Sequence, residues 1–207
     1  MPTLNTPSKP ANRATHARAF VALALAVLLV GCAAVSKVNT GEVVLKNRLV
    51  VNVDAAWNQF ERGMADNTPT WTVEGITVDA VQFYVAVRDG ELIAPTPAGA
   101  KAAVPLAFKA SMQPAEVATL YQALWTRDGS SFKLERIAPV AFAGGNGFRF
   151  EYELVRKVDE VRLRGVAWGV VRNNELFLIN YMAPRLSFFE RHLKRVEALA
   201  ASAKVRG

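Results

Sequence analysis

The sequence predicts an α+β domain: an antiparallel sheet of about six to seven strands, a mid-chain helix, and a long C-terminal helix packed on the sheet. Two observations predict it. Apolar and polar side chains alternate in short segments separated by tight turns, as in antiparallel strands with one buried face. Apolar residues recur at the spacing of a helix over two long segments, residues 111–126 and 187–205.

The predicted domain begins with a strand over residues 43–53, where apolar side chains alternate with others. A short helix is expected over residues 55–62, because Asp54 can cap its first turn and Gly63 can end it. The first two elements are therefore a strand and a helix.

Residues 77–87 give the clearest strand pattern in the chain. The dipeptide Asp89-Gly90 that follows is a strong hairpin signal, so a return strand is expected to begin at Leu92. Residues 93–107 are rich in Pro, Ala and Gly and are expected to form a long surface loop. The alternation predicts one shared strand face for Val81, Phe83, Val85 and Val87.

Ser111 is expected to cap the mid-chain helix. A meander of strands follows, with turns at residues 144–147, 158–160 and 173–174. Residues 175–182 are almost continuously apolar, which predicts that this last strand is central in the sheet. The apolar face of the mid-chain helix is expected to contain Val117, Leu120, Tyr121 and Leu124.

The C-terminal helix is expected to begin with a capping box formed by Ser187 and Glu190. Its apolar positions recur at helical spacing and predict a stripe packed against the sheet. That stripe is expected to contain Phe189, Leu193, Val196, Ala200 and Ala203.

The N-terminal segment carries a targeting signal. Residues 1–18 are polar and contain basic but no acidic side chains, and residues 19–30 are apolar throughout. The tetrapeptide Leu29-Val30-Gly31-Cys32 then resembles the bacterial lipobox. The resemblance implies cleavage after Gly31, a diacylglycerol on the Cys32 thiol, and an acyl chain such as palmitate on the new N-terminus. An ordinary secreted protein or an N-terminal membrane anchor remains the alternative.

These boundaries predict a signal peptide over residues 1–31, a tether over 32–41 and a single domain over 42–207. Lipoprotein sorting favours the inner membrane when Asp follows the cysteine, whereas here Ala33 and Ala34 follow it. The expected location is therefore the periplasmic face of the outer membrane, with the periplasmic face of the inner membrane as the alternative.

Composition excludes several kinds of chemistry. Cys32 is the only cysteine, and the chain has two histidines, of which His16 leaves with the signal peptide. A thiol nucleophile, a disulfide and a histidine-rich metal site are therefore not expected, and we predict no catalytic residues, metal or cofactor. The net charge is +7, but the sequence has no clustered basic stripe of the kind found in nucleic-acid-binding proteins. No nucleic-acid partner is therefore expected.

The order of the predicted elements resembles the PsbP/DcrB-like fold. The residues that carry the resemblance are 51–57 at the start, and 165–170, 176–181 and the helix over 187–205 at the end. The resemblance covers most of the mature chain. It implies a binding or assembly-assisting module that is commonly lipid-anchored and non-catalytic, and it assigns no site residues.

Few residues are candidates for a ligand site. Arg162 and Arg164 point the same way on one strand and could clamp an anion, although pairing with Glu151 or Glu153 on the adjacent strand is favoured. The tryptophans, Trp168 among them, could line a pocket, although core packing is favoured. His192 is expected to be a half-buried packing residue rather than a general base. The glycine-rich segment 144–147 is expected to be a hairpin turn, since no helix follows it to bind phosphate.

Three functions follow from these observations. The favoured one is a non-catalytic binding or scaffolding module, attached to the membrane through Cys32 and contacting an envelope protein. The alternative is a carrier of a small apolar ligand with a pocket between sheet and helices. The third is an enzyme that uses neither Cys nor His chemistry.

Overall fold

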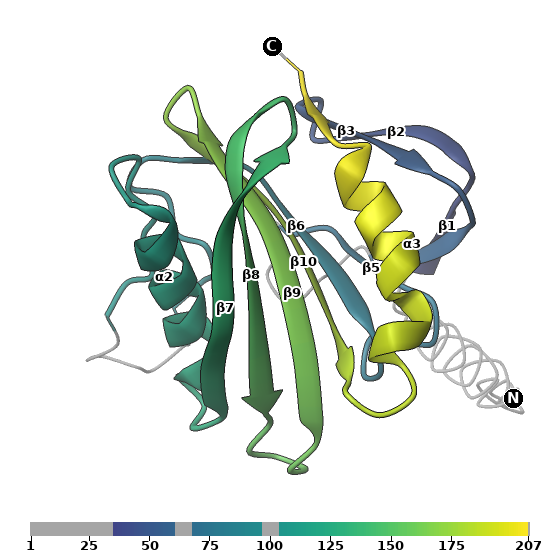
Figure 1. Cartoon of the computed structure of the whole chain (residues 1–207), viewed down its shortest axis with the longest axis vertical. Helices are drawn as coiled ribbons and strands as arrows, with labels where there is room; N and C mark the ends of the chain where they lie inside the picture. The colour runs from purple at the N-terminus through teal and green to yellow at the C-terminus, as the bar shows by residue number, and fades with distance from the viewer. Residues whose placement is uncertain (1–34, 61–67, 97–103, 207) are drawn as a thin grey trace, which may run out of the picture. The chain divides into compact units, whose positions relative to one another are not determined.

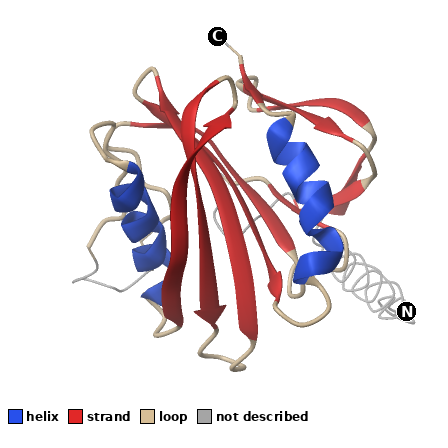
Figure 2. Ribbon diagram, in the orientation of Figure 1, coloured by secondary structure: helices blue, strands red, loops and turns tan. Residues whose placement is uncertain are grey.

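The computed structural model describes residues 35–60, 68–96 and 104–206. These residues form two antiparallel sheets and two helices, which confirms the predicted α+β class (Figures 1 and 2). The strands of the large sheet are, in spatial order, β1 (Val35–Val38), β4 (Trp57–Phe60), β5 (Thr70–Thr72), β6 (Ala80–Arg88), β10 (Glu175–Pro184), β9 (Arg162–Arg172), β8 (Gly145–Val155) and β7 (Ser131–Phe142). The small sheet contains β11 (Lys204–Val205), β3 (Leu49–Val53) and β2 (Gly41–Leu45).

The domain has a layered arrangement, with the large sheet in the middle (Figure 1). Helix α2 (Pro114–Thr126) covers one face, and helix α3 (Phe189–Ala201) and the small sheet cover the other. Two hydrophobic cores result, one on each face. The predicted central position of the last strand is confirmed, because β10 lies between β6 and β9 and is buried on both faces.

A β-bulge interrupts β6. Ala86 has a φ of 54°, and the register with β10 shifts there: Tyr84 lies opposite Leu178, whereas Val87 lies opposite Leu176. The extra residue on β6 turns the following side chain to the other face. Val81, Phe83 and Val85 share the α3 face as expected, but Val87 joins Tyr84 on the α2 face, so the prediction of one face for all four is wrong at Val87.

Two glycines of β9 permit close packing of aromatic rings from β8. Gly165 lies opposite Tyr152, and Gly169 lies opposite Phe148. A Cβ placed on Gly165 would lie 2.0 Å from Cζ of Tyr152, and one on Gly169 would lie 2.5 Å from Cζ of Phe148. Any larger residue at either position would displace a buried ring.

The N-terminal elements differ from the prediction. Residues 43–53 are not one strand but most of the hairpin β2–β3, in which Lys46 and Asn47 both adopt positive φ and reverse the chain. The expected helix over 55–62 is wrong: Trp57–Phe60 form β4, which pairs with β1 and β5, while residues 61–62 lie outside the described residues. Sheet pairing on both sides, with Trp57 fully buried, outweighs local helix propensity here.

Within the expected tether over 32–41, Val35–Val38 form β1. The proposed signal peptide and Cys32 lie outside the described residues. The turn at Asp89-Gly90 is present, but no hairpin follows it: β6 pairs with β5 and β10, and Leu92 forms a single bridge with Ala107. Part of the expected loop over 93–107 is therefore held against the domain, and Ile93 is buried.

Both helices begin later than expected. Helix α2 starts at Pro114, and the carboxylate of Glu116 accepts a hydrogen bond from the backbone N–H of Gln113 at 2.7 Å. Helix α3 starts at Phe189, and because Ser187 has a φ of 75°, the predicted capping box is wrong. Helix α3 ends at Ala201, after which the chain forms β11. The buried residues of α3 are Phe189, His192, Val196, Leu199 and Ala200.

Candidate functional site

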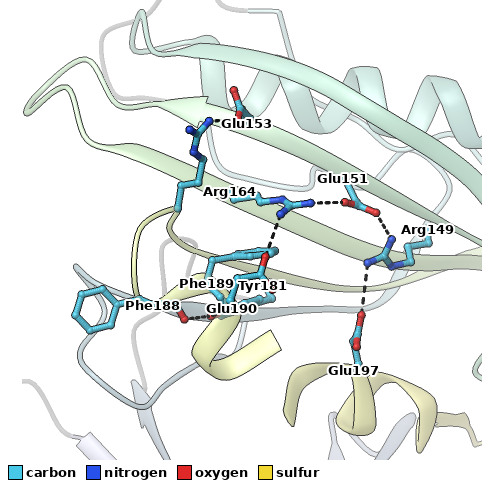
Figure 3. Close-up of polar contacts among 10 residues, drawn as sticks. Arg149, Glu151, Glu153, Arg164, Tyr181, Phe188, Phe189, Glu190 and Glu197 are labelled. Carbon is cyan, nitrogen blue, oxygen red and sulfur yellow. Dashed lines mark hydrogen bonds and ion pairs between the residues drawn. The ribbon is translucent and has the colours of Figure 1, made fainter. Parts of the chain in front are cut away.

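A row of charged side chains lies between the large sheet and α3 (Figure 3). Glu151 of β8 contacts two arginines: Arg149 on the same strand, and Arg164 on β9 through an Nη2–Oε2 distance of 3.1 Å. Each arginine also reaches α3, since Arg164 Nη1 lies 3.0 Å from Glu190 Oε1 and Arg149 Nη2 lies 3.6 Å from Glu197 Oε1. The row therefore joins two strands to the helix.

The pairing expected for Arg164 with Glu151 is confirmed. Burial alone would raise the pKa of Glu151, but the hydrogen bonds from Arg149 and Arg164 outweigh it and hold that pKa below its ordinary value. The guanidinium of Arg164 also lies over the ring of Phe189 at 5.1 Å. Its charge is thus already compensated by two carboxylates, which favours a role in docking α3 over a role as an anion clamp.

The other two candidates lie on the same face of β9 but in different surroundings. Trp168 is buried, with the guanidinium of Arg149 over its ring at 5.4 Å. Arg162 is exposed at the start of β9, opposite Val155. The structure therefore does not bring Arg162, Arg164 and Trp168 together around one cavity.

His192 is more deeply buried than the half-buried position expected for it. The residue is 9% exposed on the inner side of α3, and Nε2 lies 3.0 Å from Glu74 Oε1. The hydrogen bond with His192 lowers the pKa of Glu74, and Arg191 adds to the effect. The histidine thus joins α3 to the β5–β6 connection. Among the described residues, no group of three or more His, Cys, Asp and Glu side chains is arranged to hold a metal ion.

Two adjacent cavities of about 210 Å³ each lie beside β6. They share Thr68, Tyr84 and Ala94 as lining residues. The first is closed by the end of α2 and is further lined by Gln82, Leu124, Trp125, Arg127 and Asp128. The second extends toward the β2–β3 turn and is further lined by Lys46, Val85, Val87, Glu91, Leu92, Ile93 and Pro95.

A buried polar network lies behind the first cavity. The Tyr121 hydroxyl donates to Gln82 Oε1 at 3.1 Å, Asn180 Nδ2 donates to the same oxygen at 3.2 Å, and the Tyr152 hydroxyl donates to Asn180 Oδ1 at 2.9 Å. Burial raises the pKa of Tyr84, Tyr121 and Tyr152, so these phenols stay protonated at neutral pH. The network gives the cavity a fixed, uncharged polar wall.

The carrier alternative predicted a pocket between sheet and helices, but sequence reasoning did not locate these cavities or name their lining residues. Three of the tryptophans are buried as expected, namely Trp57, Trp71 and Trp168. Trp125 is only partly buried and lines the first cavity, beside Tyr121 at a ring distance of 6.2 Å. The helical spacing of Tyr121 and Leu124 indicated an apolar face, but it contained no signal that part of this face borders open space.

The comparisons with known proteins support the fold. No protein-family model matches the chain, and no curated protein matches its sequence. The solution structure of the cyanobacterial PsbP protein CyanoP from Synechocystis is similar, with a TM-score of 0.54, 12% identity, and coverage of 86% of this chain and 95% of that chain. At this identity the similarity shows the fold alone, and the domain has a PsbP-like fold, as expected.

Two further structures are more distant. A crystal structure from Bacteroides thetaiotaomicron matches with a TM-score of 0.42, 12% identity, and coverage of 82% of this chain and 50% of that chain. The structure of LpqN, a protein involved in cell envelope biogenesis of Mycobacterium tuberculosis, matches with a TM-score of 0.37, 7% identity, and coverage of 86% of this chain and 88% of that chain.

In the part of the chain that the structure describes, no helix is long and apolar enough to cross a membrane.

Proposed function

We propose that the protein is a lipid-anchored, non-catalytic binding module of the bacterial envelope, held at the periplasmic face of the outer membrane through Cys32. The observation that carries the proposal is the distance along the chain between Cys32 and the folded domain. The sequence over residues 29–32 matches the lipobox, and β1 begins at Val35.

This short separation restricts where the domain can be. Three fully extended residues span at most about 11 Å. A diacylglycerol on Cys32 would therefore hold the start of β1 beside the lipid headgroups. Val35 is 51% exposed and begins an edge strand of the large sheet. The domain would act on molecules at the same membrane surface, and an envelope protein is the partner that fits this position.

The polar clusters support a binding role over catalysis. Arg149 and Arg164 are compensated by Glu151, Glu190 and Glu197. The imidazole of His192 is hydrogen-bonded to Glu74. Each cluster joins α3 to another part of the domain, to β8 and β9 in one case and to the β5–β6 connection in the other. An enzyme without Cys or His chemistry would need a cleft in which several carboxyl groups face the substrate. The carboxylates of these clusters instead form ion pairs or hydrogen bonds with Arg or His side chains of the same domain.

Metabolic labelling with a clickable palmitate analogue tests the anchor. The wild-type chain should incorporate label and sediment with outer-membrane vesicles, and Cys32→Ala should lose both properties, while Ser36→Ala serves as a matched control nearby. Sedimentation with inner-membrane vesicles would select the alternative location. An unlabelled wild-type chain would refute the lipid anchor.

A cross-linking pull-down tests the partner. Membrane-anchored chain should enrich an envelope protein that the Cys32→Ala variant, no longer held at the membrane, does not enrich. Equal recovery from both forms would contradict a partner restricted to the membrane surface. The carrier function remains the second candidate, and the two cavities beside Tyr84 are the observation that favours it.

A further inference from the structure

The two cavities beside Tyr84 have the features of one ligand site. Each has a volume of about 210 Å³, below the range of roughly 300–1,000 Å³ typical of small-molecule pockets. Because they share Thr68, Tyr84 and Ala94, a ligand that spans both would occupy a space within that range. The site lies between β6, the end of α2 and the segment around Ala94.

The lining is apolar, with a few buried polar groups. Aromatic and aliphatic side chains come from α2, β6 and the segment at 92–95. Gln82 is 1% exposed and Thr68 is 5% exposed, and both line the first cavity. Buried polar side chains in an apolar wall are the usual means by which a pocket orients a ligand.

The charges at the two ends of the site are balanced. Arg127 lies beside Asp128 at the end of the first cavity, and the guanidinium of Arg127 donates to the carbonyl of Pro95 at 3.0 Å. Lys46 lies near Glu91 in the second cavity, where burial lowers the pKa of Lys46 and Glu91 opposes that effect. Each end thus has one basic and one acidic group, so the site offers no net charge to compensate a charged ligand, whose desolvation would be unfavourable.

The aromatic wall favours a planar ligand. Tyr84 packs edge-on against Tyr121 at a ring distance of 6.0 Å, and Tyr121 in turn contacts Trp125. A flat ring can pack against Tyr84 and Trp125 with either offset or edge-to-face geometry.

We propose that the space shared by the two cavities between β6 and α2 binds an uncharged, planar apolar molecule that has one hydrogen-bonding group. The ring packs against Tyr84 and Trp125, and the polar group faces Thr68. The site is formed by the folded domain, so the proposal goes beyond the membrane anchor and does not depend on Cys32.

Fluorine NMR of the full chain in lipid nanodiscs tests this site. The chain contains four tryptophans, so 5-fluorotryptophan gives four resonances, and Trp125→Phe identifies the one that reports on the cavity. The probes share one ring and differ in charge: 2-naphthol, naphthalene-2-sulfonate and 2-naphthylmethylammonium. We expect 2-naphthol to shift the Trp125 resonance saturably, while Trp57, Trp71 and Trp168 on the opposite face do not move.

Two matched variants locate the binding. Ala94→Leu places a larger side chain in the space that both cavities share, and should weaken 2-naphthol binding at least tenfold. Ala138→Leu makes the same change at β7, in a separate shallow groove, and should leave binding unchanged. The unmoved Trp57, Trp71 and Trp168 resonances verify that each variant is folded, and a nuclear Overhauser effect between 2-naphthol and the Trp125 fluorine tests the site without any variant.

Three results would overturn the proposal. These are a linear, unsaturable response of Trp125 to 2-naphthol, equal or tighter binding of either charged probe, and unchanged binding in a folded Ala94→Leu variant. None of them bears on palmitate labelling of Cys32, so failure of this site and failure of the membrane anchor are distinguishable.

Discussion

Replacing Gly165 with alanine should strongly destabilise the domain. The new Cβ would lie 2.0 Å from Cζ of Tyr152 and 2.4 Å from both of its Cε atoms, so the ring must move. It has little freedom to do so. Tyr152 is fully buried, stacks on Phe132 at 4.6 Å, and donates a hydrogen bond to Asn180 at 2.9 Å.

Two costs add in this variant. Overpacking a dense core costs about 1–3 kcal/mol. Moving the ring also breaks the hydrogen bond to Asn180 and leaves a buried amide oxygen unsatisfied, which costs roughly 1–3 kcal/mol. We therefore expect a loss of about 2–6 kcal/mol, a large part of the roughly 5–15 kcal/mol that holds a domain folded.

Urea denaturation followed by far-UV circular dichroism measures this loss. Gly90→Ala is the control, because Gly90 has a φ of 78° but no atom within 4 Å of a Cβ there, so only backbone strain of about 1–2 kcal/mol is expected. In a Tyr152→Leu background, Gly165→Ala should cost at least about 1.5 kcal/mol less than alone. The close-packing argument fails if Gly165→Ala is no worse than Gly90→Ala, or if the background makes no difference.

Two further predictions concern the charged row and the membrane side of the domain. Because the pKa of Glu151 is lowered in the folded state, its stabilisation is complete at neutral pH and is lost as the pH falls from the ordinary value of 4.5 through the lowered folded-state pKa. Glu151→Gln should therefore cost about 1–2 kcal/mol in urea denaturation at pH 7 and progressively less as the pH is lowered through this range. A cost that does not change with pH would contradict the assignment. The second prediction compares Lys37→Cys on β1 with Lys133→Cys on β7. If Cys32 is lipidated, the thiol of Lys37→Cys should react with a bulky maleimide at least several-fold more slowly than that of Lys133→Cys in intact vesicles, and at the same rate in detergent. Equal rates in vesicles would show that β1 is not held at the membrane surface.

Elements defined by local chemistry were predictable from the sequence. Asn173 and Asn174 both adopt positive φ and form the expected tight turn between β9 and β10. The alternation of β8 and β9 correctly indicated that Arg164 would pair with Glu151 or Glu153, and it pairs with Glu151. The uninterrupted apolar run of β10 correctly indicated burial on both faces, because its side chains must serve two cores.

Elements defined by distant partners were not predictable. The segment around Trp57 has acceptable helix caps, and only its pairing with β1 and β5 makes it a strand. The turn at Lys46 and Asn47 contains no glycine, so the β2–β3 hairpin resembled a single strand. The candidate ligand site is the extreme case, since its walls come from the regions around residues 46, 68, 82–95 and 124–128, which are far apart in the sequence, and no one of them indicates the open space.

The bulge in β6 links the fold to that site. In a regular strand Val87 would lie on the same face as Val85, and Ala86 would follow Tyr84 on the α2 face. The extra residue at Ala86 instead brings Val87 to the side of Tyr84, and Val85 and Val87 both line the second cavity. Bulges commonly re-aim side chains next to functional sites. The bulge at Ala86, near the end of β6, is therefore a reason to place the ligand site beside Tyr84 and Val87, while the charged row under α3 secures that helix.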